Sequence, residues 1–189
     1  MKKNNLLDLM RAKNTLFTVK EVALIWEETD MNFVRKKLHR YVKAGKLYSV
    51  RKGIYTKDEK YEKFELATKI FTPSYISFET VLAKAGIVFQ FYGQIFVASY
   101  CTRTLTIDGQ TYSLKKIRDS ILTDKTGLEE REGYFIASPE RAFLDVVYLN
   151  KEYYFDNLVG INWDKVSKIL PIYGGNRRME KEVKKYHDT

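Results

Sequence analysis

The chain has 189 residues, of which 44% are hydrophobic and 30% are charged, and its formal net charge is +9. This length and composition provide for one ordinary core or two small ones and exclude a disordered protein. A single cysteine, Cys101, excludes an internal disulfide, and no apolar signal core follows Met1, so we expect a cytoplasmic protein. The longest uncharged run, residues 85–102, is interrupted by glycine and glutamine, and no membrane span is expected.

The first part of the chain has the order of elements that is typical of a DNA-binding module. A short amphipathic helix is expected over about residues 4–13, and Thr18 with Glu21 forms a capping box that starts a second helix. Asp30 is the expected cap of a third helix, which runs to residue 44 and ends at Gly45. Strands at 47–50 and 54–56, joined by the turn at residues 51–53, follow this helix. The order predicts a winged helix-turn-helix domain over residues 1–57.

The charged run at residues 57–60 marks the expected boundary to a second domain, residues 58–189. Helices are expected at 62–71 and at 78–85, where Ser77 is the predicted cap. Four strands are expected at 95–100, 104–107, 111–117 and 133–137, and residues 108–109 are a hairpin signal. Ser138 with Pro139 predicts another helix start, and two more helices are expected at 162–170 and 176–186. The predicted fold class is therefore α+β, with a winged helix-turn-helix followed by a mixed α+β domain.

Nearly all of the excess positive charge lies in the N-terminal segment. Residues 1–60 contain fifteen Lys or Arg against seven Asp or Glu, and residues 31–57 contain nine basic side chains and no acid. A patch of this density attracts polyanions, and the release of counterions from phosphates makes such binding dependent on salt. The sequence therefore indicates nucleic acid as a partner.

The predicted third helix has two distinct faces. At 100° per residue, Val34, Leu38, Tyr41 and Val42 fall within one arc of about 100°, which suits packing on the second helix. Asn32 at the helix start is the expected adenine reader, and Arg35 or Lys36 the guanine reader. Arg40 and Lys43 are expected at phosphates, and His39 at a phosphate or a base. The turn between the strands is expected at an adjacent minor groove or at the backbone. The candidate DNA-binding residues are Asn32, Arg35, Lys36, His39, Arg40, Lys43, Arg51 and Lys52.

Other interpretations were weighed against duplex DNA. A basic helix face can simply be solvated, but such a face usually mixes signs of charge. RNA is disfavoured because only Tyr48 and Tyr55 could provide a stacking platform within residues 30–57. A DNA nuclease targeted by the winged helix is the alternative enzyme, with Asp108 and Asp119 as the acids that it would need. No catalytic, cofactor-binding or metal-binding residue is predicted, and we expect a protein that is not an enzyme.

Four segments resemble a known family. Residues 17–22 (FTVKEV) and 38–55 (LHRYVKAGKLYSVRKGIY) are similar to the winged-helix domain of AbiEi-type antitoxins. Residues 76–82 (ISFETVL) with Gly86, and 136–145 (IASPERAFLD), are similar to the antitoxin domain that follows it. The resemblance covers most of residues 15–150, and the last segment, which ends at Asp145, is its most specific part.

The resemblance implies a bacterial transcriptional regulator that is the antitoxin of a type IV toxin–antitoxin system. Its N-terminal domain would bind the operator of its own operon and repress it, with the basic residues of the third helix as the operator contacts. Its C-terminal domain would neutralise a nucleotidyltransferase-like toxin without forming a stable complex with it. A stand-alone repressor without a toxin is the alternative within the same class. The resemblance assigns no role to residues 151–189.

Overall fold

Three helices and a small sheet make up the first part of the chain. The computed structural model describes residues 5–90 and 92–188. The helices are α1 (Asn5–Arg11), α2 (Val19–Trp26) and α3 (Met31–Lys43). The sheet contains β1 (Leu16–Thr18), β2 (Tyr48–Arg51) and β3 (Ile54–Thr56) in the order β1-β3-β2, and both pairings are antiparallel. The sequence predicted the three helices and the two later strands, but it did not predict β1.

The rest of the described chain is built on a mixed six-stranded sheet. Its order is β6-β7-β5-β4-β9-β8, with parallel pairings of β5 with β7 and of β4 with β9. The strands are β4 (Ser74–Ile76), β5 (Gln94–Ser99), β6 (Arg103–Ile107), β7 (Gln110–Lys116), β8 (Leu128–Arg131) and β9 (Tyr134–Ala137). Two sheets together with the helices make the protein mixed α+β, as the sequence predicted.

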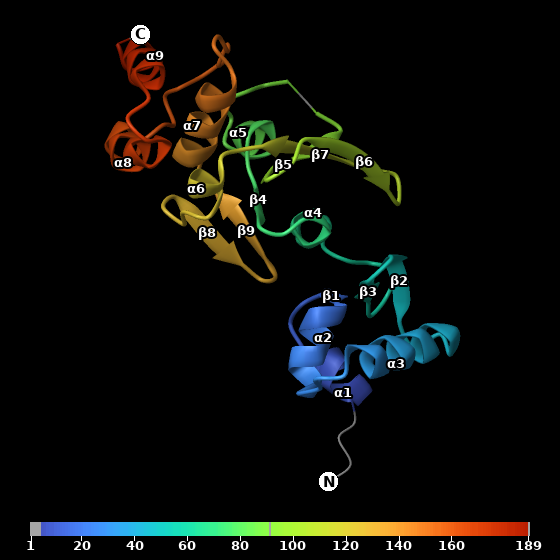
Figure 1. The fold of residues 1–189 in the computed structure, drawn as a ribbon. Coiled ribbons are helices and arrows are strands. Elements are labelled where there is room, and N and C mark those ends of the chain that lie inside the picture. The colour runs from blue at the N-terminus through green and yellow to red at the C-terminus, as the bar shows by residue number, and fades with distance from the viewer. Residues whose placement is uncertain (1–4, 91, 189) are drawn as a thin grey trace.

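The helices of this larger part lie either next to the sheet or at the C-terminal end of the molecule (Figure 1). Figure 1 shows α4 between the six-stranded sheet and the N-terminal elements, whereas α7, α8 and α9 form a group at the C-terminal end. The helices are α4 (Lys63–Ile70), α5 (Glu79–Lys84), α6 (Asp119–Leu122), α7 (Pro139–Leu149), α8 (Trp163–Ile169), the 3-10 helix η1 (Leu170–Tyr173) and α9 (Arg177–His187). Within residues 5–90 and 92–188, no helix has the length and apolar character that crossing a membrane requires.

Two clusters of buried side chains hold the fold together, and the three-stranded sheet lies between them. Phe17 belongs to a small cluster with residues of α1, α2 and α3, including Trp26 and Leu38. Leu16 and Ile54 belong to the large cluster around the six-stranded sheet. Successive side chains of a strand point to opposite faces, so β1 and β3 contribute to both clusters. The small sheet therefore packs on the rest of the molecule with one of its faces.

One predicted helix start is wrong. Ser77 was expected to cap the helix at 78–85, but α5 begins at Glu79, and Phe78 precedes it with a φ of 56°. The hydroxyl of Ser77 donates to Asp145 at 2.7 Å, so it is used in the core and does not cap the helix. The N–H of Val81 and that of Leu82 instead donate to the carbonyl of Phe78, at 3.0 Å each.

Candidate nucleic-acid interface

The start and end of α3 are fixed by the residues that the sequence indicated. Oδ1 of Asp30 accepts hydrogen bonds from the backbone N–H groups of Asn32 (2.8 Å) and Phe33 (3.1 Å). These bonds satisfy two of the N–H groups that a helix leaves without an internal partner. At the other end, Gly45 has a φ of 65°, which costs glycine little and ends the helix. Between these points, Val34 and Leu38 are fully buried against the small cluster.

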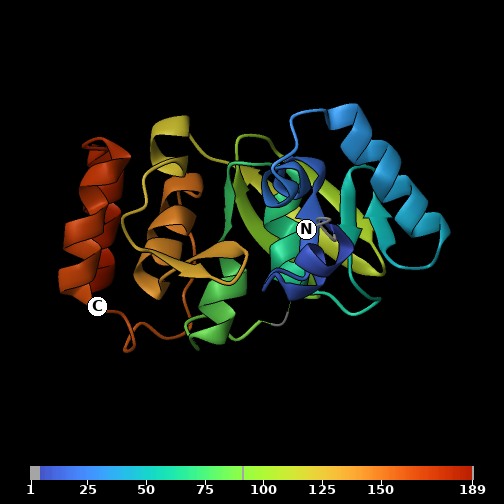
Figure 2. The same ribbon diagram turned by 90° about the horizontal axis from the view of Figure 1, so that it is seen from below.

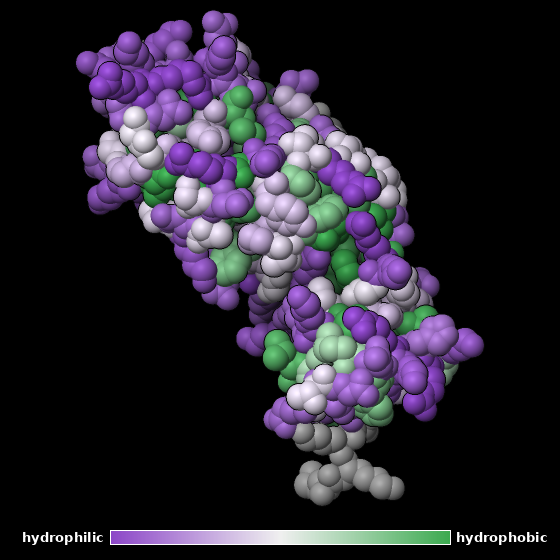
Figure 3. Space-filling model, viewed as in Figure 1, coloured by the Kyte–Doolittle hydropathy of each residue, from purple (hydrophilic) through white to green (hydrophobic). Residues whose placement is uncertain are grey.

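The opposite face of α3 is exposed and carries the predicted donors. Oδ1 of Asn32 accepts a hydrogen bond from Nη1 of Arg35 at 3.3 Å, so the two expected base readers are joined one turn apart. Figure 3 shows hydrophilic residues gathered over the far end of α3, and Figure 2 shows this helix along the outer edge of the molecule. The exposed residues of this face are Asn32, Arg35, Lys36, His39, Arg40 and Lys43.

Aromatic contacts hold α3 against the helices that precede it. The rings of Trp26 and Tyr41 meet edge to face, with their centres 6.2 Å apart, and the indole Nε1 donates to the carbonyl of Asn5 at 2.7 Å. The ammonium of Lys37 lies 5.4 Å from the ring centres of both Trp26 and Phe33. Lys37 thus lies over this aromatic group, apart from the six donors. Burial raises the pKa of the Tyr41 hydroxyl, as expected for a side chain packed against Trp26.

The hairpin of β2 and β3 brings only one of its two predicted residues to the surface. Lys52 is exposed in the turn, where Gly53 has a φ of 84°. Arg51 is half-buried, and its guanidinium carbon lies 5.8 Å from the ring centre of Phe71, the residue that follows α4. Of the two tyrosines weighed as a stacking platform, Tyr55 packs on the small cluster, and Tyr48 is exposed. Arg51 therefore lies against the larger part of the molecule.

A buried ionic contact joins the N-terminal elements to α4. Oε2 of Glu65 accepts hydrogen bonds from Thr15 N (2.9 Å), Thr15 Oγ1 (2.6 Å) and Leu16 N (3.3 Å). Nζ of Lys69 lies 3.1 Å from Oε1 of Glu65 and 2.6 Å from Oε1 of Glu21, and it donates to the carbonyl of Leu16. Glu21 is also the capping-box acid of α2, since it accepts from the N–H of Thr18. The helix that supports α3 is thus fixed to α4 through its own first turn.

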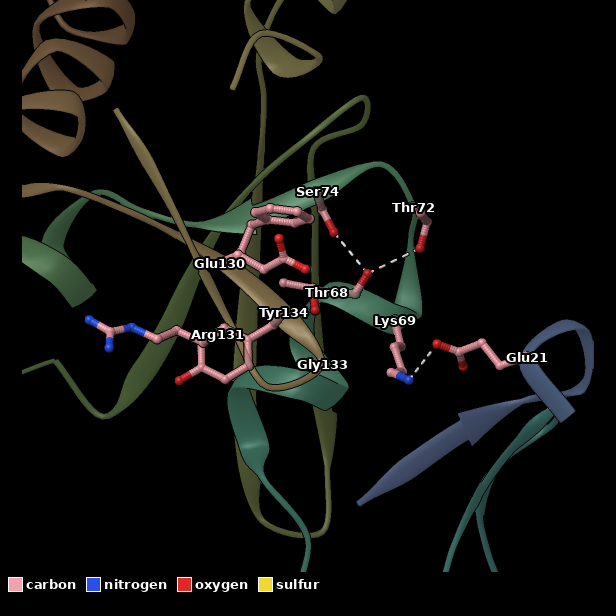
Figure 4. Close-up of a pocket in the computed structure, with 10 residues that line it drawn as sticks. Glu21, Thr68, Lys69, Thr72, Ser74, Glu130, Arg131, Gly133 and Tyr134 are labelled. Atoms are coloured by element: carbon pink, nitrogen blue, oxygen red, sulfur yellow. Dashed lines mark hydrogen bonds and ion pairs between the residues drawn. The ribbon is translucent and has the colours of Figure 1, made fainter. Parts of the chain in front are cut away.

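A cavity of about 210 Å³ lies beside this contact (Figure 4). The hydroxyls of Thr72 and Ser74 both donate to the carbonyl of Thr68, at 3.2 and 2.9 Å. In Figure 4 the ammonium of Lys69 points toward Glu21, whereas Arg131 extends away from the hydroxyls. The two hydroxyls that line the cavity hold the start of β4 to α4. The ammonium of Lys69 holds α4 to α2.

The acids of the nuclease alternative occupy a turn and a helix start. Asp108 lies in the β6–β7 turn with a φ of 47°, and its Oδ2 accepts a hydrogen bond from the Tyr61 hydroxyl at 2.5 Å. Asp119 is the exposed first residue of α6. In the described segments 5–90 and 92–188, no three His, Cys, Asp or Glu side chains form a group that could hold a metal ion. The described structure therefore provides neither acid with a metal-binding partner group.

Comparison with known proteins adds no relative. No family model matches this sequence, and no curated protein matches it either. The resemblance to AbiEi-type antitoxins therefore stays a prediction from the four segments quoted above.

Proposed function

We propose that residues 5–57 form a winged helix-turn-helix that binds duplex DNA, and that the protein is a transcriptional repressor. The observation that carries the proposal is the exposed, acid-free donor face of α3, which is followed along the chain by a hairpin whose turn presents Lys52. The major groove admits an α-helix, and the N-terminal residues of a recognition helix commonly reach base edges. In this arrangement α3 is the recognition helix, and β2 with β3 is the wing.

The donors on α3 divide into two roles by their position along the helix. Asn32 lies in the first turn, and its amide can pair bidentately with adenine, while Arg35 beside it can pair with guanine. Arg40 and Lys43 lie in the last turn and suit phosphate oxygens, which carry no information about sequence. The protein thus has both a means of reading sequence and a means of holding the backbone.

The experiment selects duplexes from a random library and then measures affinity for the preferred duplex and for an unrelated one. Lys43→Ala is expected to weaken both duplexes alike, because it removes a phosphate contact. Asn32→Ala is expected to cost about 1–3 kcal/mol on the preferred duplex only. Lys168→Gln on α8 is the matched control, since it removes an exposed cation far from α3 along the chain. Equal losses for Asn32→Ala on both duplexes would refute the assigned reader.

The antitoxin role is the second part of the proposal, and the resemblance of residues 76–82 and 136–145 supports it. The partner is then a nucleotidyltransferase-like toxin that is neutralised without a stable complex. Co-expression with a neighbouring reading frame of that kind tests the proposal: the full chain is expected to restore growth. If the full chain does not restore growth, the protein is a repressor without an antitoxin role.

A further inference from the structure

Two arginines from different sheets each contact the same aromatic ring, that of Phe71. The guanidinium carbon of Arg51, at the end of β2, lies 5.8 Å from the ring centre of Phe71. That of Arg103, the first residue of β6, lies 5.9 Å from the same centre. Tyr100 packs edge to face on Phe71, with the ring centres 6.0 Å apart. The ring thus holds two guanidinium groups that are separated by no more than about 12 Å.

Neither of these arginines is paired with an acid in the part of the chain that the structure describes. No carboxylate lies within ion-pair distance of Arg51 or Arg103 among the residues that the structure describes. Nη1 of Arg51 is buried and has no hydrogen-bond acceptor within the same residues. A buried donor without an acceptor is rare in folded proteins, because it has lost its hydrogen bonds to water. Two guanidinium groups at one ring, neither of them paired with a described carboxylate, leave a local positive charge that an anion can neutralise.

The position of the pair indicates which anion it meets. The N–H of Val19, the first residue of α2, donates to the carbonyl of Gly53 at 3.3 Å, so the wing turn lies against the start of α2. In a helix-turn-helix, the helix before the recognition helix crosses the DNA backbone. Arg51 directly precedes this turn, so the pair lies near the start of the helix that the proposed function places across the DNA backbone.

We propose that Arg51 and Arg103, held by Phe71, form an anion site that binds phosphate oxygens. A guanidinium offers two parallel N–H donors to a phosphate, which a lysine cannot match. The phosphate is supplied either by the DNA backbone, an assignment that rests on the proposed function, or by a free phosphate group. In the first case the six-stranded part of the molecule contributes, through Arg103, a contact that lies outside the winged helix.

The DNA arm of the test compares Arg103→Gln with Lys168→Gln, both of which remove one exposed cation. Affinity for the selected duplex is measured across a salt series. Arg103→Gln is expected to lower affinity roughly five- to tenfold and to reduce the slope of log K against log salt by about 0.9. Lys168→Gln is expected to leave both quantities unchanged. Arg103→Lys is expected to keep the slope and to lose part of the affinity, because the charge remains and the planar fork is lost.

The second arm measures the thermal unfolding midpoint in inorganic phosphate against chloride at equal ionic strength. A rise for the wild type that disappears in Arg103→Gln assigns the site to free phosphate. If the wild type binds no duplex, the proposed function fails, and this arm alone decides the anion site. If Arg103→Gln matches Lys168→Gln in DNA binding and phosphate gives no shift, the anion site is refuted. Circular dichroism of each variant confirms that the fold is retained.

Discussion

At the scale of the residue, Asp145 connects three parts of the fold. Its carboxylate accepts hydrogen bonds from Ser77 Oγ (2.7 Å), the Tyr173 hydroxyl (2.7 Å) and the Tyr75 hydroxyl (3.0 Å). Nε of Arg141, one turn earlier on α7, lies 3.5 Å from Oδ1. Burial raises the pKa of Asp145, and the Arg141 charge and the three hydroxyls act in the opposite direction. Ser77 and Asp145 come from the two later segments of the family resemblance, so those segments meet in the core.

Replacing Asp145 with asparagine is expected to destabilise the protein by about 3–5 kcal/mol. The amide would replace one accepting oxygen by a donor that faces at least one of these hydroxyl donors, and it would leave the buried Arg141 without its counter-charge. Urea unfolding measures the effect as a lower midpoint with an unchanged slope. Glu59→Gln removes an exposed acid and is expected to change stability by less than about 0.5 kcal/mol. A loss as small as that of the control would show that the network does not hold the core.

Asp124 provides a pH-dependent contribution of known sign. The N–H of Thr126 donates to Oδ1 of Asp124 at 2.8 Å, and this hydrogen bond lowers the pKa of the carboxyl below its usual 3.8. A lowered pKa stabilises the folded state above pH 3.8, and the stabilisation is lost as the pH falls through the folded-state value. Wild type is therefore expected to be more stable than Asp124→Asn at pH 6, by at most about 1 kcal/mol because solvent screens the group. The difference in unfolding free energy should narrow as the pH falls below 3.8, and a constant difference would contradict this account.

At the scale of the element, α3 depends on its cap for its first turn. Asp30→Ala removes the acceptor of two backbone N–H groups and is expected to cost about 1 kcal/mol of stability. Asp30→Ser keeps a cap and removes the charge, and it is expected to recover most of that loss. The measurement is the unfolding free energy of both variants. If alanine and serine at this position are equally destabilising, the charge of Asp30 matters more than its hydrogen bonds.

The elements that the sequence predicted well are those with local signals. Thr18 with Glu21, Asp30 and Ser138 each cap the helix that was expected to follow, because a cap contacts N–H groups only two or three residues away. The outward placement of the six donors on α3 follows in the same way from helical periodicity. The β6–β7 hairpin was likewise indicated by its turn, Asp108 and Gly109.

At the scale of the whole molecule, the strands that were not predicted are short, and two of them, β1 and β4, depend on distant partners. β1, β4 and β8 have three or four residues each, and β1 becomes a strand by pairing with β3 across most of the N-terminal part. The contacts that Arg51 and Arg103 each make with Phe71 link the two sheets and have no local sequence signal. Because no local signal marks these contacts, the sequence predicts Arg51 as an outward-facing residue of the turn. Such contacts arise only when the two sheets are packed.

The predicted domain boundary at residues 57–58 implies that the two parts of the molecule unfold separately. The buried contact of Glu65 and Lys69 with Thr15, Leu16 and Glu21 instead favours one cooperative unit. Leu16 and Ile54 also lie in the large cluster. If one half unfolded alone, this contact would be lost and the half that stayed folded would keep buried charges without partners. We therefore expect the small cluster and the six-stranded part to unfold together.

The two tryptophans allow this expectation to be measured. Trp26 is buried in the small cluster, so in a Trp163→Phe variant its fluorescence reports on that cluster alone, while circular dichroism reports on all helices. The two urea transitions are expected to coincide. Adding Lys69→Met leaves Glu65 and Glu21 without their shared ammonium, so the fluorescence transition should move to lower urea, ahead of the circular dichroism transition. Adding Lys168→Met to the same background is the control and should keep the transitions together. Two separate transitions already in the Trp163→Phe protein would mean that the halves are independent domains and that the buried contact does not couple them.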